Sequence, residues 1–170
     1  MELIQTIPMP GLHDGDFDHF AVDLQGRRLF LAAEENAVVE VFDLRTNKLI
    51  HTISDVKAPH SMVYRADLKK LFVVDGGAAE ITIFDGSSYK RTGNVKLKVD
   101  CDSMAYDPAT KYMYVVNGKL HSDAAYSFIS VVDTTAARKL ADIRVGSSYV
   151  EGMALEKSGP WLFAIENYII

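Results

Sequence analysis

The 170-residue sequence lacks several features that would narrow its function at once. Its single cysteine, Cys101, excludes an internal disulfide and a metal site built from cysteines. No apolar run approaches the roughly 18 residues of a membrane span, and the first residues show neither the basic start nor the apolar stretch of a signal peptide. No capped 3.6-residue period is sustained, so we expect little or no helix.

Positive charge is also sparse and scattered. The chain has 18 lysines and arginines against 23 aspartates and glutamates, a net charge of −5, and no basic run exceeds two residues. Such a surface offers no stripe that could follow a phosphate backbone, so nucleic acid is not an expected partner. Hydrophobic residues make up 48% of the chain, which indicates a globular fold with a core rather than a disordered chain.

What the sequence does contain is an internal repeat. The segment F-A-V-D-L-Q-G-R-R-L-F-L-A-A from Phe20 returns in altered form from Met62, Met104 and Met153, at spacings of 42, 42 and 49 residues. Each unit has short runs of alternating, β-branched and aromatic residues, bounded by turn formers such as the D-P pair at Asp107. Four short strands per roughly 40–50 residues are typical of a β-propeller blade; a β-sandwich, the alternative, requires no fixed period.

The sequence therefore predicts an all-β fold, a β-propeller of four-stranded antiparallel blades, here an arc of about 3.75 blades over residues 1–170. The expected divisions are residues 2–7 (the last strand of a preceding blade), 17–53, 59–96, 101–145 and 150–170 (an incomplete blade). These hold 15 strands, whereas a closed seven-bladed ring needs about twice as many, so we expect a part of a longer propeller. Open blade edges recruit other strands, which predicts self-association.

The repeated strands also resemble those of a known family. L-F-V-V-D after Lys70 and M-Y-V-V-N after Tyr112 look like variants of a Y-V-T-N motif, and V-E-V-F-D, I-T-I-F-D and I-S-V-V-D resemble that family's third-strand pattern. From Leu3 to Glu166 the chain is similar to the YVTN-repeat, YncE-like propellers. The resemblance implies a seven-bladed fold, a periplasmic or extracellular location and, for many members, no assigned activity.

Candidate functional residues follow from the repeat. In a propeller, the loop into the first strand of each blade and the loop after the second strand lie on one face, around the central channel. The residues aligned at these places are Asp18, His60, Asp102 and Glu151 before or within the first strands, and Ala33, Asp75, Asn117 and Glu166 at the ends of the second. All but the alanine could bind an ion or a ligand; the alternative is a solvated rim whose residues cap strand ends and turns.

The densest group of ligand-capable residues is the segment H-D-G-D-F-D-H, residues 13–19. Its D-x-D-x-D spacing is that of a calcium loop, but His19 stands where glycine is needed and Gln25 where the bidentate glutamate belongs. An EF-hand is thereby rejected. The residues kept as candidate ligands of another cation are His13, Asp14, Asp16 and His19, and a polar loop is the alternative reading.

Other features are weaker. Phe30, Phe72, Tyr114 and Phe163 recur in the second strands, so we expect them to pack as core between blades. Cys101 is expected to be buried and inert, with a reactive thiolate as the alternative. The insertion over residues 118–127, which contains His121 and Tyr126, could overhang the rim as a recognition loop. No G-x-S-x-G or H-E-x-x-H motif is present.

Three functions remain open. The first is a non-catalytic propeller that binds a peptide, a glycan or a small ligand at the channel rim, with no cofactor specified beyond a candidate divalent cation. The second is a lactonase-like hydrolase in which a metal ion polarises a lactone or ester; its candidate ligands are Glu151, Asn117, Asp75 and Asp102. The third is a quinoprotein or haem-type redox propeller, with His60 as the candidate axial ligand.

Overall fold

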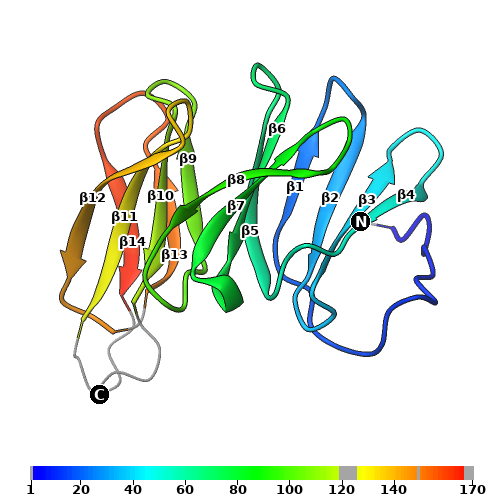
Figure 1. The fold of residues 1–170 in the computed structure, drawn as a ribbon, viewed down its shortest axis with the longest axis horizontal. Helices are drawn as coiled ribbons and strands as arrows, with labels where there is room; N and C mark the ends of the chain where they lie inside the picture. Colours follow the sequence, from blue (N-terminus) through cyan, green and yellow to red (C-terminus); the bar gives the residue numbers. More distant parts are fainter. Residues whose placement is uncertain (1, 119–125, 149, 167–170) are drawn as a thin grey trace.

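The computed structural model describes residues 2–118, 126–148 and 150–166. Their strands form three four-stranded antiparallel sheets and one two-stranded sheet, side by side in an arc (Figure 1). The predicted all-β propeller arc is confirmed. Within these ranges the one helical element is a 3₁₀ turn, η1 (Gly76–Ala78), and no helix has the length and apolar character needed to cross a membrane.

Each four-stranded sheet is one blade, in which every strand pairs with the next along the chain. The first blade consists of β1 (Phe20–Asp23), β2 (Arg28–Ala33), β3 (Val38–Asp43) and β4 (Lys48–Ile53). The second consists of β5 (Pro59–Arg65), β6 (Lys70–Asp75), β7 (Glu80–Asp85) and β8 (Arg91–Lys96). The third consists of β9 (Met104–Asp107), β10 (Tyr112–Asn117), β11 (Ser127–Asp133) and β12 (Arg138–Val145), and the two-stranded sheet of β13 (Val150–Leu155) and β14 (Leu162–Glu166).

The repeat extends to the backbone conformation of the turns. Arg27, Lys69 and Lys111 each stand directly before the second strand of their blade, with φ angles of 52°, 51° and 66°. Non-glycine residues adopt this left-handed region rarely, because Cβ crowds the following carbonyl oxygen. The same local conformation therefore recurs in three blades, although none of the three turns has glycine at this position.

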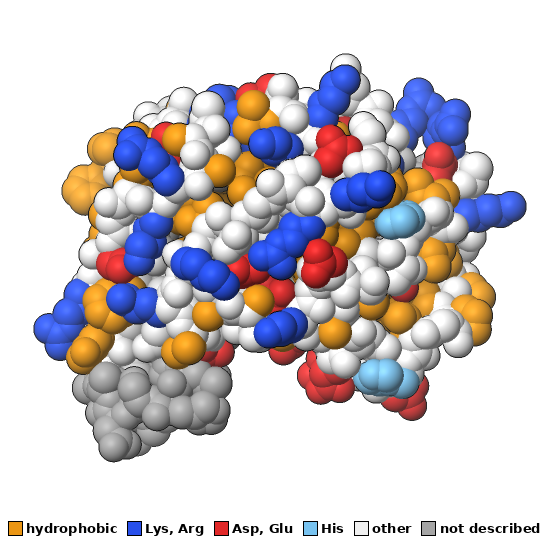
Figure 2. All heavy atoms as spheres, viewed as in Figure 1, with side chains coloured by type: hydrophobic (Ala, Val, Ile, Leu, Met, Phe, Trp, Pro, Cys, Tyr) orange, Lys and Arg blue, Asp and Glu red, His pale blue; other side chains and the backbone are white. Residues whose placement is uncertain are grey.

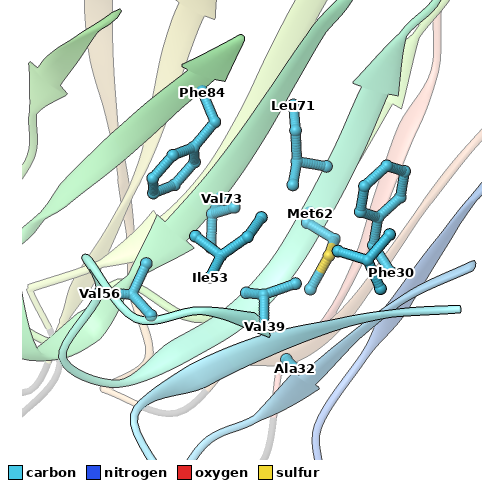
Figure 3. Packing of buried hydrophobic residues seen from close by; sticks show 10 residues of the cluster. Phe30, Ala32, Val39, Ile53, Val56, Met62, Leu71, Val73 and Phe84 are labelled. Atoms are coloured by element: carbon cyan, nitrogen blue, oxygen red, sulfur yellow. The ribbon is translucent and has the colours of Figure 1, made fainter. Parts of the chain in front are cut away.

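Apolar side chains fill each boundary between neighbouring blades. At the first boundary, Phe30 and Val39 of the first blade pack with Met62 and Leu71 of the second (Figure 3). A second cluster joins blades two and three, and a third joins blade three to the two-stranded sheet. Full burial of one such side chain stabilises a fold by about 1.5–3 kcal/mol. Stacking of neighbouring blades, rather than one central core, therefore holds the arc together.

Arginines also link neighbouring blades, at the end of the strands away from the predicted rim. The Arg28 guanidinium lies 2.7 Å from the Asp23 carboxylate of its own blade and donates to the Tyr64 hydroxyl of the next blade at 2.9 Å. Arg65 likewise pairs with Asp67 and donates to Thr134 of the third blade. Each link spans a blade boundary, so it fixes how two blades meet.

The strand expected over residues 2–7 is not present. The segment carries no strand, and it lies over the open side of the first blade, where Gln5 accepts a hydrogen bond from Asn47 at 2.6 Å. Ile7 and Met9 face Leu29 and other apolar residues of that blade across a shallow cavity. No described strand pairs with this segment, and a strand needs a partner for its backbone groups. The described ranges accordingly hold 14 strands rather than 15.

The expectation for the four repeated aromatic residues holds only in part. Phe30 and Phe72 are fully buried between blades, whereas the Phe163 side chain on β14 is 59% exposed. Its neighbours Trp161 and Ile165 are exposed as well. Among the described residues no further sheet packs against this face of β14, so the position has no partner to bury it.

Candidate functional site

Three of the predicted rim residues, from three blades, meet at one point. Asp18 precedes β1, His60 is the second residue of β5, and Asp102 precedes β9. Nδ1 of His60 lies 2.7 Å from Oδ2 of Asp18 and 3.7 Å from Oδ1 of Asp102. The repeat alignment therefore selected positions that the propeller geometry brings together.

The backbone holds the two aspartates in equivalent ways. The amide of Asp18 donates to the Ala32 carbonyl at 3.0 Å, and the amide of Asp102 donates to the Val116 carbonyl at 3.1 Å. Both accepting residues lie next to the end of the second strand of the same blade. The first-strand loop is thus tied to the second strand in both blades, which fixes the carboxylates on either side of His60.

Glu34 belongs to the same cluster but was not among the predicted residues. It follows β2 directly, and its Oε2 lies 3.7 Å from Nδ1 of His60. The equivalent residues one and two blades later are Gly76 and Gly118, so the repeat gave no signal for a side chain at this position. A search of the first residue after each second strand for any charged side chain would have found it.

The second ring nitrogen of His60 faces backbone rather than carboxylates. A Cβ atom added at Gly76 would lie 2.7 Å from Nε2 of His60 and 3.0 Å from the carbonyl oxygen of Cys101. Glycine therefore allows the imidazole to pack closely against the chain that follows β6. This packing leaves Nδ1 as the nitrogen directed at Asp18, Glu34 and Asp102.

The charges in the cluster act on one another. Burial by itself lowers the pKa of His60, but the hydrogen bond to Asp18 and the charges of Glu34 and Asp102 raise it above its ordinary value. Burial raises the pKa of Asp18, but contacts with His60 and His19 outweigh it and lower that pKa. Burial, with the nearby carboxylates, raises the pKa of Glu34 despite His60. The site thus favours a cation at the position of the imidazole.

Asp75 and Asn117 have other partners. The Asp75 carboxylate accepts from the amides of Lys57, Ala58 and Ala78 at 2.9–3.1 Å. The Asn117 side chain accepts from the Lys98 amide at 3.1 Å and donates to Val115 and Ser130. Both side chains are fully buried, and each fastens the loop that leads into the first strand of its own blade.

The last two rim predictions lie on the two-stranded sheet. Glu151 is part of β13, and its side chain is outside the described residues. Glu166 ends β14, where it pairs with Val150. As ligand residues these two stay predictions. Within the inserted segment, residues 119–125, which include His121, are also outside the described ranges, and Tyr126 contacts Phe128 edge to face.

Of residues 13–19, only Asp18 belongs to the group of described residues whose donor atoms lie close enough together to hold one ion. Asp18 joins His60, and the exposed His19 contacts the other oxygen of Asp18. His13 is held elsewhere, because its backbone exchanges two hydrogen bonds with the side chain of Asn36. Asp14 is exposed, and Asp16 lies near enough to raise the pKa of Glu34. Acidic and histidine side chains show at the lower edge of the molecule in Figure 2, below the first blade.

Cys101 is fully buried beside this face. Its Sγ lies 3.3 Å from the carbonyl oxygen of Asp75, and burial raises the pKa of the thiol to about 12. A thiol with such a pKa is protonated near neutral pH, and the residue has no exposed surface. The side chain therefore behaves as a small apolar residue, as expected for a structural cysteine.

The fold and the rim cluster define a β-propeller arc with a charged site at its channel face. No family model and no curated protein matches the sequence. Among solved structures, the chain is similar to a Kuenenia stuttgartiensis hydrazine synthase, with a TM-score of 0.77 and 20% identity over 95% of this chain. It is also similar to the WD40 β-propeller domain of Doa1, with a TM-score of 0.71 and 10% identity over 90% of this chain. The matches span 46% and 48% of those structures, slightly less than half, and show the fold alone.

Proposed function

We propose that this chain is a non-catalytic binding propeller, of the YncE-like type that its repeated strands resemble, whose ligand face is the channel rim. One observation carries the proposal: the carboxylates of Asp18, Glu34 and Asp102 converge on Nδ1 of His60. The loop before β1, the turn after β2, the start of β5 and the loop before β9 together supply a convergent set of polar groups, which is how binding sites form on rigid scaffolds.

The charge of the cluster favours a positively charged ligand. Even with His60 protonated, three carboxylates leave an excess of negative charge. The side chains of His60, Asp18 and Asp102 are 14%, 19% and 25% exposed, so water screens their charges less than at an open surface. A peptide, glycan or small ligand that presents an ammonium or guanidinium group would meet this charge directly.

A titration followed by amide NMR tests the proposal. The probe is a short peptide containing arginine and lysine, and its control replaces these by the neutral citrulline and acetyl-lysine. We expect saturable shifts at residues 18, 34, 60 and 102 with the charged peptide alone. Asp102→Asn should weaken binding by about tenfold or more, since a hydrogen bond to a charged group contributes about 1.5–3 kcal/mol. Equal shifts with both peptides, or shifts confined to other residues, would refute the proposal.

A metal-dependent hydrolase is the second candidate, because Asp18, Glu34 and His60 could hold a metal ion. The ligand set differs from the one expected from the sequence, since Asp75 and Asn117 are engaged with loop backbone. Hydrolysis of a panel of lactones and esters, with and without added divalent ions, tests it. Metal-dependent turnover that Asp102→Asn or Glu34→Gln abolishes would favour the hydrolase over the binding module.

The location of the protein is part of the proposal. The resemblance to exported YncE-like propellers supports a periplasmic or extracellular location. Fractionation of cells that express the gene from its own locus, followed by immunodetection, tests it. Recovery with a cytoplasmic marker protein would argue against it.

A further inference from the structure

We infer that the rim cluster binds one divalent first-row transition-metal ion through Nδ1 of His60 and one carboxylate oxygen each of Asp18 and Glu34. The inference rests on the proposed function, because it names the cation that the same site takes. Among the described residues, Asp18, Glu34 and His60 form a group whose donor atoms all lie within 4.8 Å of one another.

The distances suit an ion at the centre of this group. Metal–ligand bonds of about 2.1 Å in a tetrahedral site place the ligand atoms about 3.4 Å apart. Nδ1 of His60 lies 3.7 Å from Oε2 of Glu34 and 3.7 Å from Oδ1 of Asp102. Its 2.7 Å contact with Oδ2 of Asp18 must lengthen by less than about 1 Å. A small side-chain rotation suffices to bring Asp18, Glu34 and His60 around one ion.

The surroundings of the cluster position its donors. Close packing of Nε2 against the chain at Gly76 keeps Nδ1 of His60 directed at the carboxylates. The backbone bond of Asp18 to Ala32 fixes the loop that carries the second donor. Glu34 is the most exposed of the three, with 34% of its side chain accessible. Two donors are thus held by the fold, and the third lies on the solvent side, where an ion arrives.

The donor types select the class of ion. One imidazole with two or three carboxylates suits Zn²⁺, Mn²⁺ or Co²⁺. Calcium requires six to eight oxygen ligands, and a site centred on an imidazole nitrogen does not supply them. An ammonium or guanidinium group would need the carboxylates but not the imidazole, so substitution of His60 separates the two kinds of cation.

Calorimetry and cobalt spectroscopy on the 170-residue chain, stripped of metal by a chelator, test the inference. We expect one Zn²⁺ per chain and visible Co²⁺ absorption bands typical of a nitrogen–oxygen site. His60→Gln and Glu34→Gln should each weaken Zn²⁺ binding by about tenfold or more. The matched controls are His51→Gln, on the outer strand β4, and Glu35→Gln, next to Glu34, and both should bind like the wild type. Thermal melts establish whether each variant is folded. If His60→Gln does not fold, the Zn²⁺ affinity of Glu34→Gln tests the inference on its own.

The outcomes separate the inference from the proposed function. Absence of Zn²⁺, Mn²⁺ and Co²⁺ binding, or binding that survives both His60→Gln and Glu34→Gln, overturns the inference. Tighter binding of Ca²⁺ than of Zn²⁺ overturns it as well. If the charged peptide still binds at the rim in metal-free buffer, the proposed function stands without the metal site. If metal binds and no peptide does, the metal site stands, and peptide recognition at the rim is refuted.

Discussion

His60 and Asp18 occupy equivalent places in neighbouring blades, 42 residues apart, and Nδ1 of the one lies 2.7 Å from Oδ2 of the other. Repeats usually place equivalent residues at similar but separate sites. Here the first strands converge on the channel, so one repeat position forms a contact between blades. A change at either residue therefore alters the site and the boundary between two blades together.

The first prediction concerns the pH dependence of this contact in metal-free protein. The pKa of His60 is raised above its ordinary value of 6.5. Because this pKa is higher in the folded state, protonated His60 contributes to the free energy of unfolding. This contribution is fully present below about pH 6.5 and is lost as the pH rises through the pKa of the folded state. Titration of the imidazole signals by NMR should show His60 titrating above its ordinary pKa of 6.5.

Asp18→Asn provides the control for that titration. It removes the hydrogen-bonded carboxylate but keeps the shape of the side chain, so the pKa of His60 should fall toward or below its ordinary value. The fall in stability with rising pH should shrink in the same variant. A His60 titration that Asp18→Asn leaves unchanged would show that this contact does not set the pKa.

The second prediction separates loop fastening from ligand binding at Asp75. Asp75→Ala removes a buried carboxylate that accepts from three backbone amides. The free energy of unfolding should fall by about 1–3 kcal/mol or more, because buried donors lose their partners. Urea denaturation measures it, with exposed Asp14→Ala as a control that should change little. Unchanged stability in Asp75→Ala would return this residue to the list of candidate ligands.

The third prediction uses the buried thiol. Because Cys101 has no exposed surface and its pKa is raised to about 12, an aromatic disulfide reagent should react very slowly with the native protein at mildly alkaline pH. One equivalent should react at once after denaturation. Rapid reaction of the native protein would show that the loop before β9 opens frequently.

The fourth prediction concerns the apolar face of β14, on which Trp161, Phe163 and Ile165 are exposed. An apolar sheet face and an unpaired strand edge favour association, so the chain should form oligomers that grow with protein concentration. Phe163→Lys should reduce the oligomer fraction in light scattering, whereas Leu140→Lys on the outer strand β12 should not. A monomer at every concentration tested would contradict the prediction.

The sequence predicted the periodic features well, because the propeller converts sequence period into spatial repetition. The 42-residue spacing placed Ala33, Asp75 and Asn117 at the ends of equivalent strands, and all three lie there. It also placed Asp18, His60 and Asp102 on one face, where they meet. These predictions required only that each blade have the same strand order and turns as the blade before it.

Features that differ from one blade to the next could not be predicted from the repeat. Glu34 aligns with glycines in the next two blades, so nothing in the repeat marked it. Whether a strand-end side chain turns toward the channel or back to a loop depends on local backbone geometry, and Asp75 and Asn117 turn to loops. Residues 2–7 match β4 in sequence, yet pattern alone cannot supply the neighbouring strand that pairing requires.

The left-handed turn residues Arg27, Lys69 and Lys111 have a consequence for engineering. Each holds a conformation that costs an L-residue roughly 1–2 kcal/mol, whereas glycine adopts it freely at an entropic cost of roughly 0.5–1 kcal/mol. The same small misfit thus occurs before the second strand of all three four-stranded blades, and other turns of these blades also hold left-handed residues other than glycine. A tandem array designed from one consensus blade with glycine at this turn would gain that difference in every unit, so its thermal tolerance would increase with the number of copies.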